Sequence, residues 1–243
     1  MFYKHAWVLG ATGGIGSVLS NICFELAQNV SLADIKDPSW GLLKIDQNKL
    51  FLKTDLSSRP EMIKFAIDSV KKFRSPDFML IASGRVFSMP LSDTSDEEIE
   101  STYKNNFKLV ALALQAFFEY CDHSSDVKKN IIIISSNASS EARPNQPIYA
   151  AMKAAINSIA QSQAVAWGHY GIKINCIAPG TVAVPRNIEF LRKKFIDFPL
   201  DQNRPLGKII FPENLIEVFK FLADPDLLMT GQVITIDGGS NLV

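Results

Sequence analysis

Short apolar runs alternate with longer amphipathic segments along the whole 243-residue chain. The short runs are continuously apolar, which is typical of parallel strands that are covered on both faces. They occupy residues 6–9, 30–33, 50–52, 78–82, 131–134, 172–177 and 233–236. This alternation predicts an α/β fold with a doubly wound, mostly parallel seven-stranded sheet and helices on both faces.

The longer segments have the apolar spacing of helices. After Pro60, residues Ile63, Ile67, Val70 and Phe73 recur at intervals that place them on one helix face. Acidic residues also follow Ser95 directly, as expected in the first turn of a helix. Three further helices are expected, from Ser95 through Leu114, from Tyr149 to Trp167, and from near Pro212 onward.

One segment, residues 181–207, departs from this alternation. It contains Pro185, Pro199 and Pro205 and has no sustained helical or strand period. An irregular insertion after a late strand is more often a binding loop or a lid than a linker between domains. We therefore expect a single domain over residues 1–243, with residues 181–207 covering the substrate.

Composition narrows the class of protein. Basic and acidic residues balance at 25 each, whereas proteins that bind nucleic acid usually carry a basic surplus. No apolar run approaches the length of a membrane span. Cys23, Cys121 and Cys176 are isolated, which favours buried thiols in a reducing compartment over a metal or redox site. We expect a cytoplasmic protein without a metal, acting on a small molecule and binding neither nucleic acid nor membrane.

A glycine-rich turn joins the first predicted strand to the first helix. Glycines let the backbone turn tightly and approach a pyrophosphate, which the free amides of the helix N-terminus bind. The position of the turn predicts a dinucleotide-binding Rossmann fold, although the spacing fits two glycine patterns equally well. The residues expected to contact the cofactor in this turn are Gly10, Thr12, Gly13, Gly14, Ile15 and Gly16.

Asp34 ends the second predicted strand, 24 residues after Gly10. A carboxylate at this place accepts hydrogen bonds from the ribose hydroxyls of adenosine and repels a 2′-phosphate. The sequence therefore favours NAD over NADP. Lys36 lies close enough to leave NADP possible.

Serine, tyrosine and lysine are placed for proton transfer near the end of the fifth strand. Ser135 and Ser136 follow that strand, and Tyr149 and Lys153 share a helix face at a spacing of four. An ordinary tyrosine pKa near 10 is too high for a base at neutral pH. A nearby ammonium group and a cationic nicotinamide would lower it.

These ordered matches resemble the short-chain dehydrogenase/reductase family in its compact single-domain branch. The resemblance runs from Gly10 to Gly239 and includes the closing segment Gly231–Gly239. It selects Ser136 over Ser135, because the family serine precedes the tyrosine by about thirteen residues, and Asn106 over Asn105. Further residues that the resemblance places against the cofactor are Asp55, Leu56, Ala82, Ser83, Gly84, Pro179, Gly180 and Thr181, with Asn175 beside the nicotinamide segment.

The resemblance implies an NAD(P)-dependent oxidoreductase that transfers a hydride between nicotinamide and a secondary alcohol or ketone. Tyr149 would be the general acid/base, Lys153 would hold the ribose, Ser136 would position the substrate oxygen, and Asn106 would complete a proton relay. It also implies a homotetramer or homodimer. Arg85 and Arg143, near strand ends, are candidates for contacting the substrate.

The sequence departs from the family pattern after the fourth strand. The usual Asn-Asn-Ala-Gly is replaced by Ile81-Ala82-Ser83-Gly84. Two other functions stay open: an NADPH-dependent 3-oxoacyl reductase, and a nucleotide-binding protein without catalysis. The enoyl reductase branch is disfavoured, because its lysine follows the tyrosine by seven residues and Lys153 follows by four.

Overall fold

The computed structural model describes residues 1–37, 46–189, 191 and 205–242. Its seven strands form one sheet in the order β3-β2-β1-β4-β5-β6-β7, and every strand pairing is parallel. The predicted doubly wound α/β fold is confirmed. The strands are β1 (Tyr3–Leu9), β2 (Ala27–Asp34), β3 (Lys49–Lys53), β4 (Phe78–Ile81), β5 (Lys129–Ile134), β6 (Ile172–Pro179) and β7 (Val233–Ile236).

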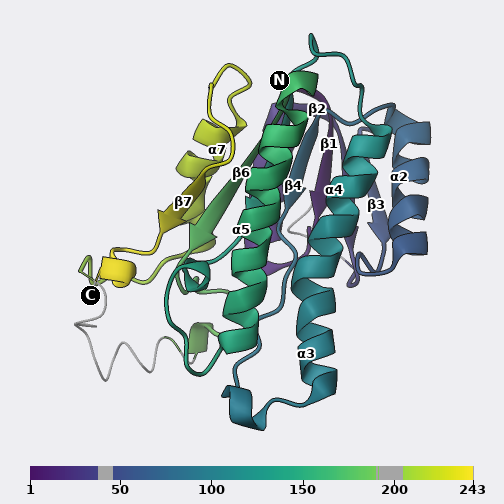
Figure 1. Cartoon of the computed structure of the whole chain (residues 1–243). Helices are drawn as coiled ribbons and strands as arrows, with labels where there is room; N and C mark the ends of the chain where they lie inside the picture. The colour runs from purple at the N-terminus through teal and green to yellow at the C-terminus, as the bar shows by residue number, and fades with distance from the viewer. Residues whose placement is uncertain (38–45, 190, 192–204, 243) are drawn as a thin grey trace.

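Helices cover both faces of the sheet, and Figure 1 shows α2, α4 and α5 together on one of them. On that face α2, α4 and α5 pack over one buried apolar cluster, and α1 and α7 pack over a second cluster on the other face. The described helices are α1 (Gly14–Leu26), α2 (Arg59–Phe73), α3 (Asp96–Tyr103), α4 (Leu109–Tyr120), α5 (Pro147–Trp167) and α7 (Ile216–Ala223).

Alternation along the strands explains why both faces need cover. In β1, Trp7 and Leu9 belong to the cluster under α2, α4 and α5, while Ala6 and Val8 belong to the cluster on the other face. All four side chains are fully buried. A strand that is buried on both faces has no polar positions, so its sequence is a continuous apolar run.

The helix expected from Ser95 through Leu114 differs in one detail. Ser95 caps its start, because the Ser95 hydroxyl accepts from the Glu98 amide at 3.3 Å and the Glu98 carboxylate accepts from the Ser95 amide at 3.0 Å. Between α3 and α4, however, the chain widens into a π-helical turn, Lys104–Lys108. Such turns are uncommon and often lie at functional sites. This one contains Asn106.

The carboxyl ends of the parallel strands meet at one edge of the sheet, where ligands bind in open α/β folds. This edge collects the glycine turn after β1, Asp34 at the end of β2, and Ser136 after β5. Much of the predicted covering loop, residues 190 and 192–204, lies outside the described residues. None of the described helices is long and apolar enough to cross a membrane.

Candidate active site

The glycine turn after β1 is packed so tightly that side chains would not fit at two positions. Gly10 has φ +86°, and a Cβ on it would lie 2.6 Å from the Ser83 amide nitrogen. A Cβ on Gly16 would lie 1.9 Å from the Gly10 carbonyl oxygen. Helix α1 begins here with no side-chain cap at Gly13 and no acidic residue in its first turn. The N-terminus of α1 is therefore suited to an anion.

Asp34 connects the second strand to this turn. Its carboxylate accepts a hydrogen bond from the Thr12 amide at 2.9 Å and a longer one from the Lys36 amide at 3.3 Å. Each carboxylate oxygen has a second lone pair that can accept from a ligand hydroxyl. The backbone of Lys36 contacts Asp34, and Ile35 beside it is 57% exposed.

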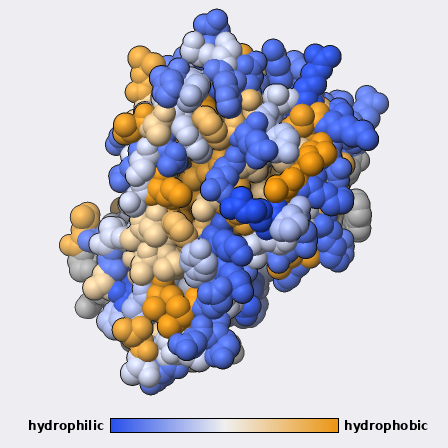
Figure 2. Space-filling view, turned by 45° about the vertical axis from the view of Figure 1, so that its right-hand side comes forward, coloured by the Kyte–Doolittle hydropathy of each residue, from blue (hydrophilic) through white to orange (hydrophobic). Residues whose placement is uncertain are grey.

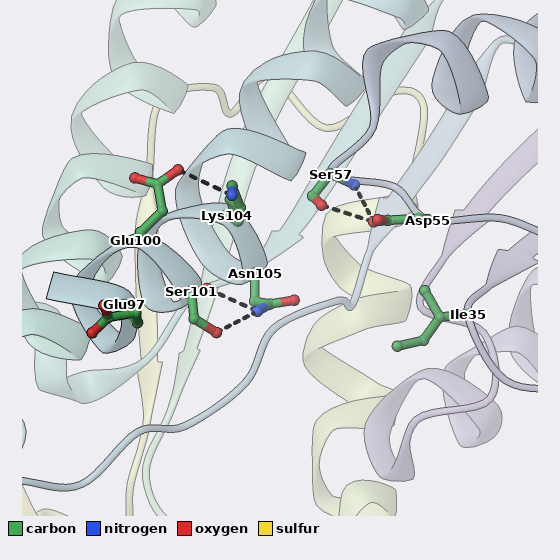
Figure 3. Close-up of a pocket in the computed structure, with 8 residues that line it drawn as sticks. All are labelled: Ile35, Asp55, Ser57, Glu97, Glu100, Ser101, Lys104 and Asn105. Carbon is green, nitrogen blue, oxygen red and sulfur yellow. Dashed lines mark hydrogen bonds and ion pairs between the residues drawn. The ribbon is translucent and has the colours of Figure 1, made fainter. Parts of the chain in front are cut away.

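A cavity of about 520 Å³ opens beside these residues (Figure 3). Ile35 and Asp55 lie on one side, and residues of α3 and the π-helical turn lie on the other. The Asp55 carboxylate accepts from the amide and the hydroxyl of Ser57, at 2.9 and 2.8 Å, while Leu56 is buried. The remaining lining residues are Glu97, Glu100, Ser101, Lys104 and Asn105.

The segment after β4 faces Asn106. A Cβ on Gly84 would lie 3.1 Å from Asn106 Oδ1 and 3.2 Å from Lys153 Nζ, so the Gly84 backbone passes close to both polar groups. Asn106 Nδ2 donates to the carbonyls of Arg85 and Thr102, but Asn106 Oδ1 is buried without a partner. A buried orphan acceptor beside an ammonium group is a suitable place for a water molecule.

Backbone contacts hold the segment after β4, where Ile81 and Ala82 stand in place of the two asparagines of the family pattern. The Ala82 amide donates to the Leu9 carbonyl at 2.8 Å and continues the pairing of β4 with β1. The Ser83 backbone packs against Gly10. Backbone contacts therefore join the ends of β1 and β4 directly.

Tyr149 and Ser136 come together at the end of β5. Tyr149 is buried in the first turns of α5, and burial raises the pKa of its phenol. A hydrogen bond with Ser136 and the positive charges of Arg186 and Arg143 act in the opposite direction on that pKa. Ser135, the alternative serine, points elsewhere, because its hydroxyl donates to the Lys153 carbonyl at 3.5 Å.

Lys153 lies one helical turn after Tyr149 and is only 3% exposed. Its Nζ donates to the Ile134 carbonyl at 3.1 Å and lies 5.7 Å from the centre of the Tyr149 ring. Burial lowers the pKa of Lys153 to about 8. The spacing of four residues predicts that the charge of Lys153 lowers the pKa of Tyr149. In the structure, burial disfavours the charged form of both side chains, the phenolate of Tyr149 and the ammonium group of Lys153.

The end of β6 contributes the last predicted residues. Pro179 is buried, Thr181 is exposed, and a Cβ on Gly180 would lie 3.0 Å from Asp237 Cβ. Asn175 lies within β6, where its side chain bonds the Met229 carbonyl and the Gln232 amide and so fixes the approach to β7.

Three polar residues that hold the Ser136 turn, Asn137, Glu141 and Asn157, do not stand out in the sequence. Asn137 and Glu141 bond each other, and Asn157 Nδ2 donates to the Ser139 hydroxyl at 2.8 Å. Of these three residues, only Asn157 has a sequence signal: it follows Lys153 by four residues, so it lies on the same face of α5 as Lys153 and Tyr149. Within the described residues, no group of three or more His, Cys, Asp or Glu side chains is arranged to hold a metal ion.

A fully parallel sheet with a glycine turn at its first carboxyl end defines the class of nucleotide-binding α/β proteins. A family model described as enoyl-(acyl carrier protein) reductase matches residues 10–241. The chain therefore belongs to the short-chain dehydrogenase/reductase family, as its motifs predicted, and it is an oxidoreductase of that family.

Several known proteins are similar over nearly the whole chain. Hydroxynaphthalene reductase-like protein Arp2 of Metarhizium brunneum is 28% identical, covering 98% of this chain and 94% of its own. An uncharacterized oxidoreductase of Schizosaccharomyces pombe is also 28% identical, with 96% and 88% covered. Two solved structures share the fold: ElxO with NADP bound, at TM-score 0.86, 22% identity and 98% of both chains, and 4-hydroxyisoleucine dehydrogenase complexed with NADH, at TM-score 0.82, 21% identity and 99% of both chains.

Proposed function

We propose that this chain transfers a hydride between a nicotinamide dinucleotide and a secondary alcohol or ketone. The observation that carries the proposal is the buried group of Ser136, Tyr149 and Lys153 at the carboxyl edge of the sheet, with Tyr149 close enough to Ser136 for its pKa to be affected and Lys153 one turn further along α5. When bound, the nicotinamide ring supplies the hydride acceptor or donor.

In this proposal Tyr149 exchanges a proton with the substrate oxygen. Its phenol meets the substrate at the end of β5, and the Ser136 hydroxyl donates to the same oxygen and fixes its direction. The Ser136 hydroxyl is itself held, because it accepts from the Ala138 amide at 3.2 Å while the Ser136 carbonyl accepts from the Ser139 hydroxyl at 2.7 Å. This turn presents the Ser136 side chain in one orientation.

Lys153 has a double role in the proposed mechanism. One of its three ammonium protons bonds the Ile134 carbonyl, which leaves one for a ribose hydroxyl of the cofactor and one for a water molecule. Asn106 Oδ1 and Lys153 Nζ both lie close to Gly84, so a water molecule between them would bond both. Protons released at Tyr149 would leave by this route.

The residues present fit a dinucleotide. The uncapped N-terminus of α1 suits the pyrophosphate, and the cavity beside Ile35 and Asp55 suits the adenosine end. We propose that Gly10, Thr12, Gly13, Gly14, Ile15 and Gly16 bind the phosphates, with Asp34, Asp55 and Leu56 at the adenosine, Ala82, Ser83 and Gly84 along the ribose, and Pro179, Gly180 and Thr181 at the nicotinamide.

Asp34 supports a preference for NAD over NADP. Its carboxylate lies at the end of β2 beside the glycine turn, where a 2′-phosphate would meet its negative charge. Related folds have been solved with either cofactor, NADP in ElxO and NADH in 4-hydroxyisoleucine dehydrogenase, so the choice rests on local residues. An NADPH-dependent 3-oxoacyl reductase is the alternative, and Lys36 is the residue that favours it.

The test is a panel of secondary alcohols and ketones with each cofactor, followed by the absorbance of the reduced nicotinamide. We expect turnover with NAD(H), weaker turnover with NADP(H), and none above background in Tyr149→Phe. A strong NADPH preference would overturn the preference for NAD, and turnover of a 3-oxoacyl substrate with NADPH would then establish the alternative. Binding of NADH without turnover of any substrate, in the parent and in Tyr149→Phe alike, would indicate a nucleotide-binding protein without catalysis.

We also propose that the chain forms a homodimer or homotetramer through its long helices. Figure 2 shows apolar surface gathered in a band on one face of the molecule. Helix α5 exposes small or apolar side chains at Ala151, Ala154 and Val165, of which Val165 is 86% exposed. Replacing Val165 by Glu should shift the mass measured by light scattering toward the monomer.

A further inference from the structure

Asn137 directly follows Ser136 and is only 3% exposed. Its Nδ2 donates to the Glu141 carboxylate at 3.3 Å and to the Ser240 hydroxyl at 3.2 Å, and the side-chain amide of Asn241 lies 3.1 Å from the same nitrogen. Its Oδ1 accepts from the Arg143 guanidinium at 3.2 Å. Both Nδ2 and Oδ1 of this buried amide therefore have hydrogen-bond partners. Two of these partners, Ser240 and Asn241, lie about a hundred residues away in the sequence.

Those distant partners belong to the short C-terminal turn Ser240–Leu242, which is rigidly built. Asp237, directly after β7, anchors it: one carboxylate oxygen accepts from the Gly239 amide at 2.9 Å, and the other accepts from the Ser240 hydroxyl at 3.0 Å and the Asn241 amide at 2.9 Å. Burial works to raise the pKa of Asp237, but these hydrogen bonds outweigh it and hold the pKa below its usual value. The turn therefore keeps its anchoring charge at neutral pH.

On its other side, Asn137 holds two groups that act on Tyr149. It heads the one-turn helix Asn137–Ser139, whose amides and hydroxyls fix the Ser136 side chain and carbonyl. It also shares the Arg143 guanidinium with Glu141, which accepts from Arg143 at 2.6 Å. Arg143 Nε is buried without a partner, so Asn137 and Glu141 provide the contacts that orient this side chain.

We propose that Asn137 is a positioning residue through which the C-terminal turn Ser240–Leu242 holds the Ser136 hydroxyl and the Arg143 guanidinium in place beside Tyr149. This role rests on the proposed function, because it acts on the proton-transferring tyrosine. The polar clamp, as we name the set Asn137, Glu141, Arg143, Asp237, Ser240 and Asn241, joins the ends of β5 and β7. The proposal assigns Asn137 no contact with substrate or cofactor.

The clamp has a consequence for the pH dependence of the reaction. Hydrogen bonding with Ser136 and the charges of Arg143 and Arg186 lower the pKa of Tyr149 against the effect of burial, while Lys153 Nζ lies 5.7 Å from the ring. Loss of the Asn137 side chain removes one of the two contacts of the Arg143 guanidinium and the bonds that tie the Ser136 turn to Ser240 and Asn241. The pKa of Tyr149 should then rise, and alcohol oxidation, which needs the phenolate, should require higher pH.

The experiment compares Asn137→Ala with Ser240→Ala, which removes only one partner at a half-buried position, and with a matched control. Asn130→Ala is that control, because Asn130 is also a buried asparagine, bonded through Nδ2 to the Leu222 carbonyl and the Tyr3 hydroxyl, at the opposite end of β5. For each variant we would measure kcat, KM, the dissociation constant of NADH, the pH profile of kcat and the hydrogen exchange of the Ala138 and Ser139 amides.

We expect kcat of Asn137→Ala to fall by about tenfold, with NADH affinity within about twofold of the parent and the acid limb of kcat moved upward by about half a pH unit or more. Ser240→Ala should change the same quantities in the same direction, less strongly, and the double variant should be no worse than Asn137→Ala alone. Exchange at Ala138 and Ser139 should accelerate in both variants and stay unchanged in Asn130→Ala.

A lowered melting temperature with unchanged kcat and pH profile would overturn the positioning role and leave the proposed reaction standing. Unchanged exchange at Ala138 and Ser139 in Asn137→Ala would also overturn it, and that measurement needs neither substrate nor cofactor. Failure of the proposed function has a different signature, because the parent chain itself would then turn over no alcohol or ketone, whether or not it bound NADH.

Discussion

Replacing the reactive lysine should make the cofactor-free protein more stable while it destroys activity. Lys153 is buried, and its pKa falls from 10.5 to about 8. One unit of pKa corresponds to about 1.4 kcal/mol, so the native state loses about 3 kcal/mol at neutral pH by holding this charge. Lys153→Met removes that cost but also leaves the Ile134 carbonyl without its donor, which costs about 1 kcal/mol.

The net expectation is a gain of about 2 kcal/mol in the free energy of unfolding at pH 7, or several degrees in melting temperature. The gain should depend on pH. Between pH 8 and 10.5 the unfolded lysine keeps its proton while the folded one has lost it, so the parent becomes more stable as pH rises through this window. At pH 9.5 the cost of the charge is about 1.5 kcal/mol, and the advantage of the variant should have nearly vanished.

Urea denaturation of both proteins at pH 7 and pH 9.5, without cofactor, measures these differences. Lys129→Met is the control for removing a buried lysine away from the site. Lys129 is fully buried and donates to the Ser124 and Val127 carbonyls at 2.7 Å each, so this variant should be less stable than the parent. A Lys153→Met protein that is less stable than the parent at pH 7, or equally shifted at both pH values, would refute the reasoning.

Two further predictions concern the space around Lys153 and a histidine far from it. Gly84→Ala should lower kcat by about tenfold or more and also lower the melting temperature, because Gly84 has φ +157° and its Cβ would crowd Asn106 Oδ1 and Lys153 Nζ. Gly168→Ala, with nothing within 4 Å of the added Cβ, is the control, and equal kcat in both variants would contradict the prediction. Burial lowers the pKa of His5 to about 4, so the parent should lose about 2.5 kcal/mol of stability between pH 7 and 4.5 as the unfolded histidine takes up a proton. His5→Gln should show a smaller loss over that range in urea denaturation, and an undiminished loss would exclude His5 as its source.

Much of the fold could be predicted because strands of a parallel sheet that is covered on both faces are apolar at every position, and such runs are visible in the sequence. Runs such as Ile131–Ile134 are apolar at every position, since alternate side chains enter different cores. The π-helical turn at Asn106 has no comparable pattern in the sequence. It changes the hydrogen-bond register of a helix whose apolar spacing continues on both sides, so periodicity predicts one uninterrupted helix.

The candidate site could be predicted only where residue types are tied to short spacings. Tyr149 and Lys153 lie one helical turn apart, and Ser136 follows a strand, so local geometry was enough to place them. Asn137 gave no such signal, because its meaning depends on Ser240 and Asn241 at the far end of the chain. Contacts of that separation arise from the strand order β5-β6-β7, which a single sequence does not reveal residue by residue.

The electrostatics of the tyrosine and lysine show why proximity alone is not enough to predict reactivity. Burial raises the pKa of Tyr149 and lowers that of Lys153 to about 8, so on raising the pH the lysine loses its charge before the phenol ionises. In the cofactor-free chain, therefore, Lys153 is not the cation that stabilises the phenolate. Under the proposed function that charge must come from Arg143 and Arg186, which already act on Tyr149, and from the cationic nicotinamide. The positive charge that stabilises the Tyr149 phenolate then comes from groups outside helix α5. A spacing of four residues within one helix cannot reveal those groups.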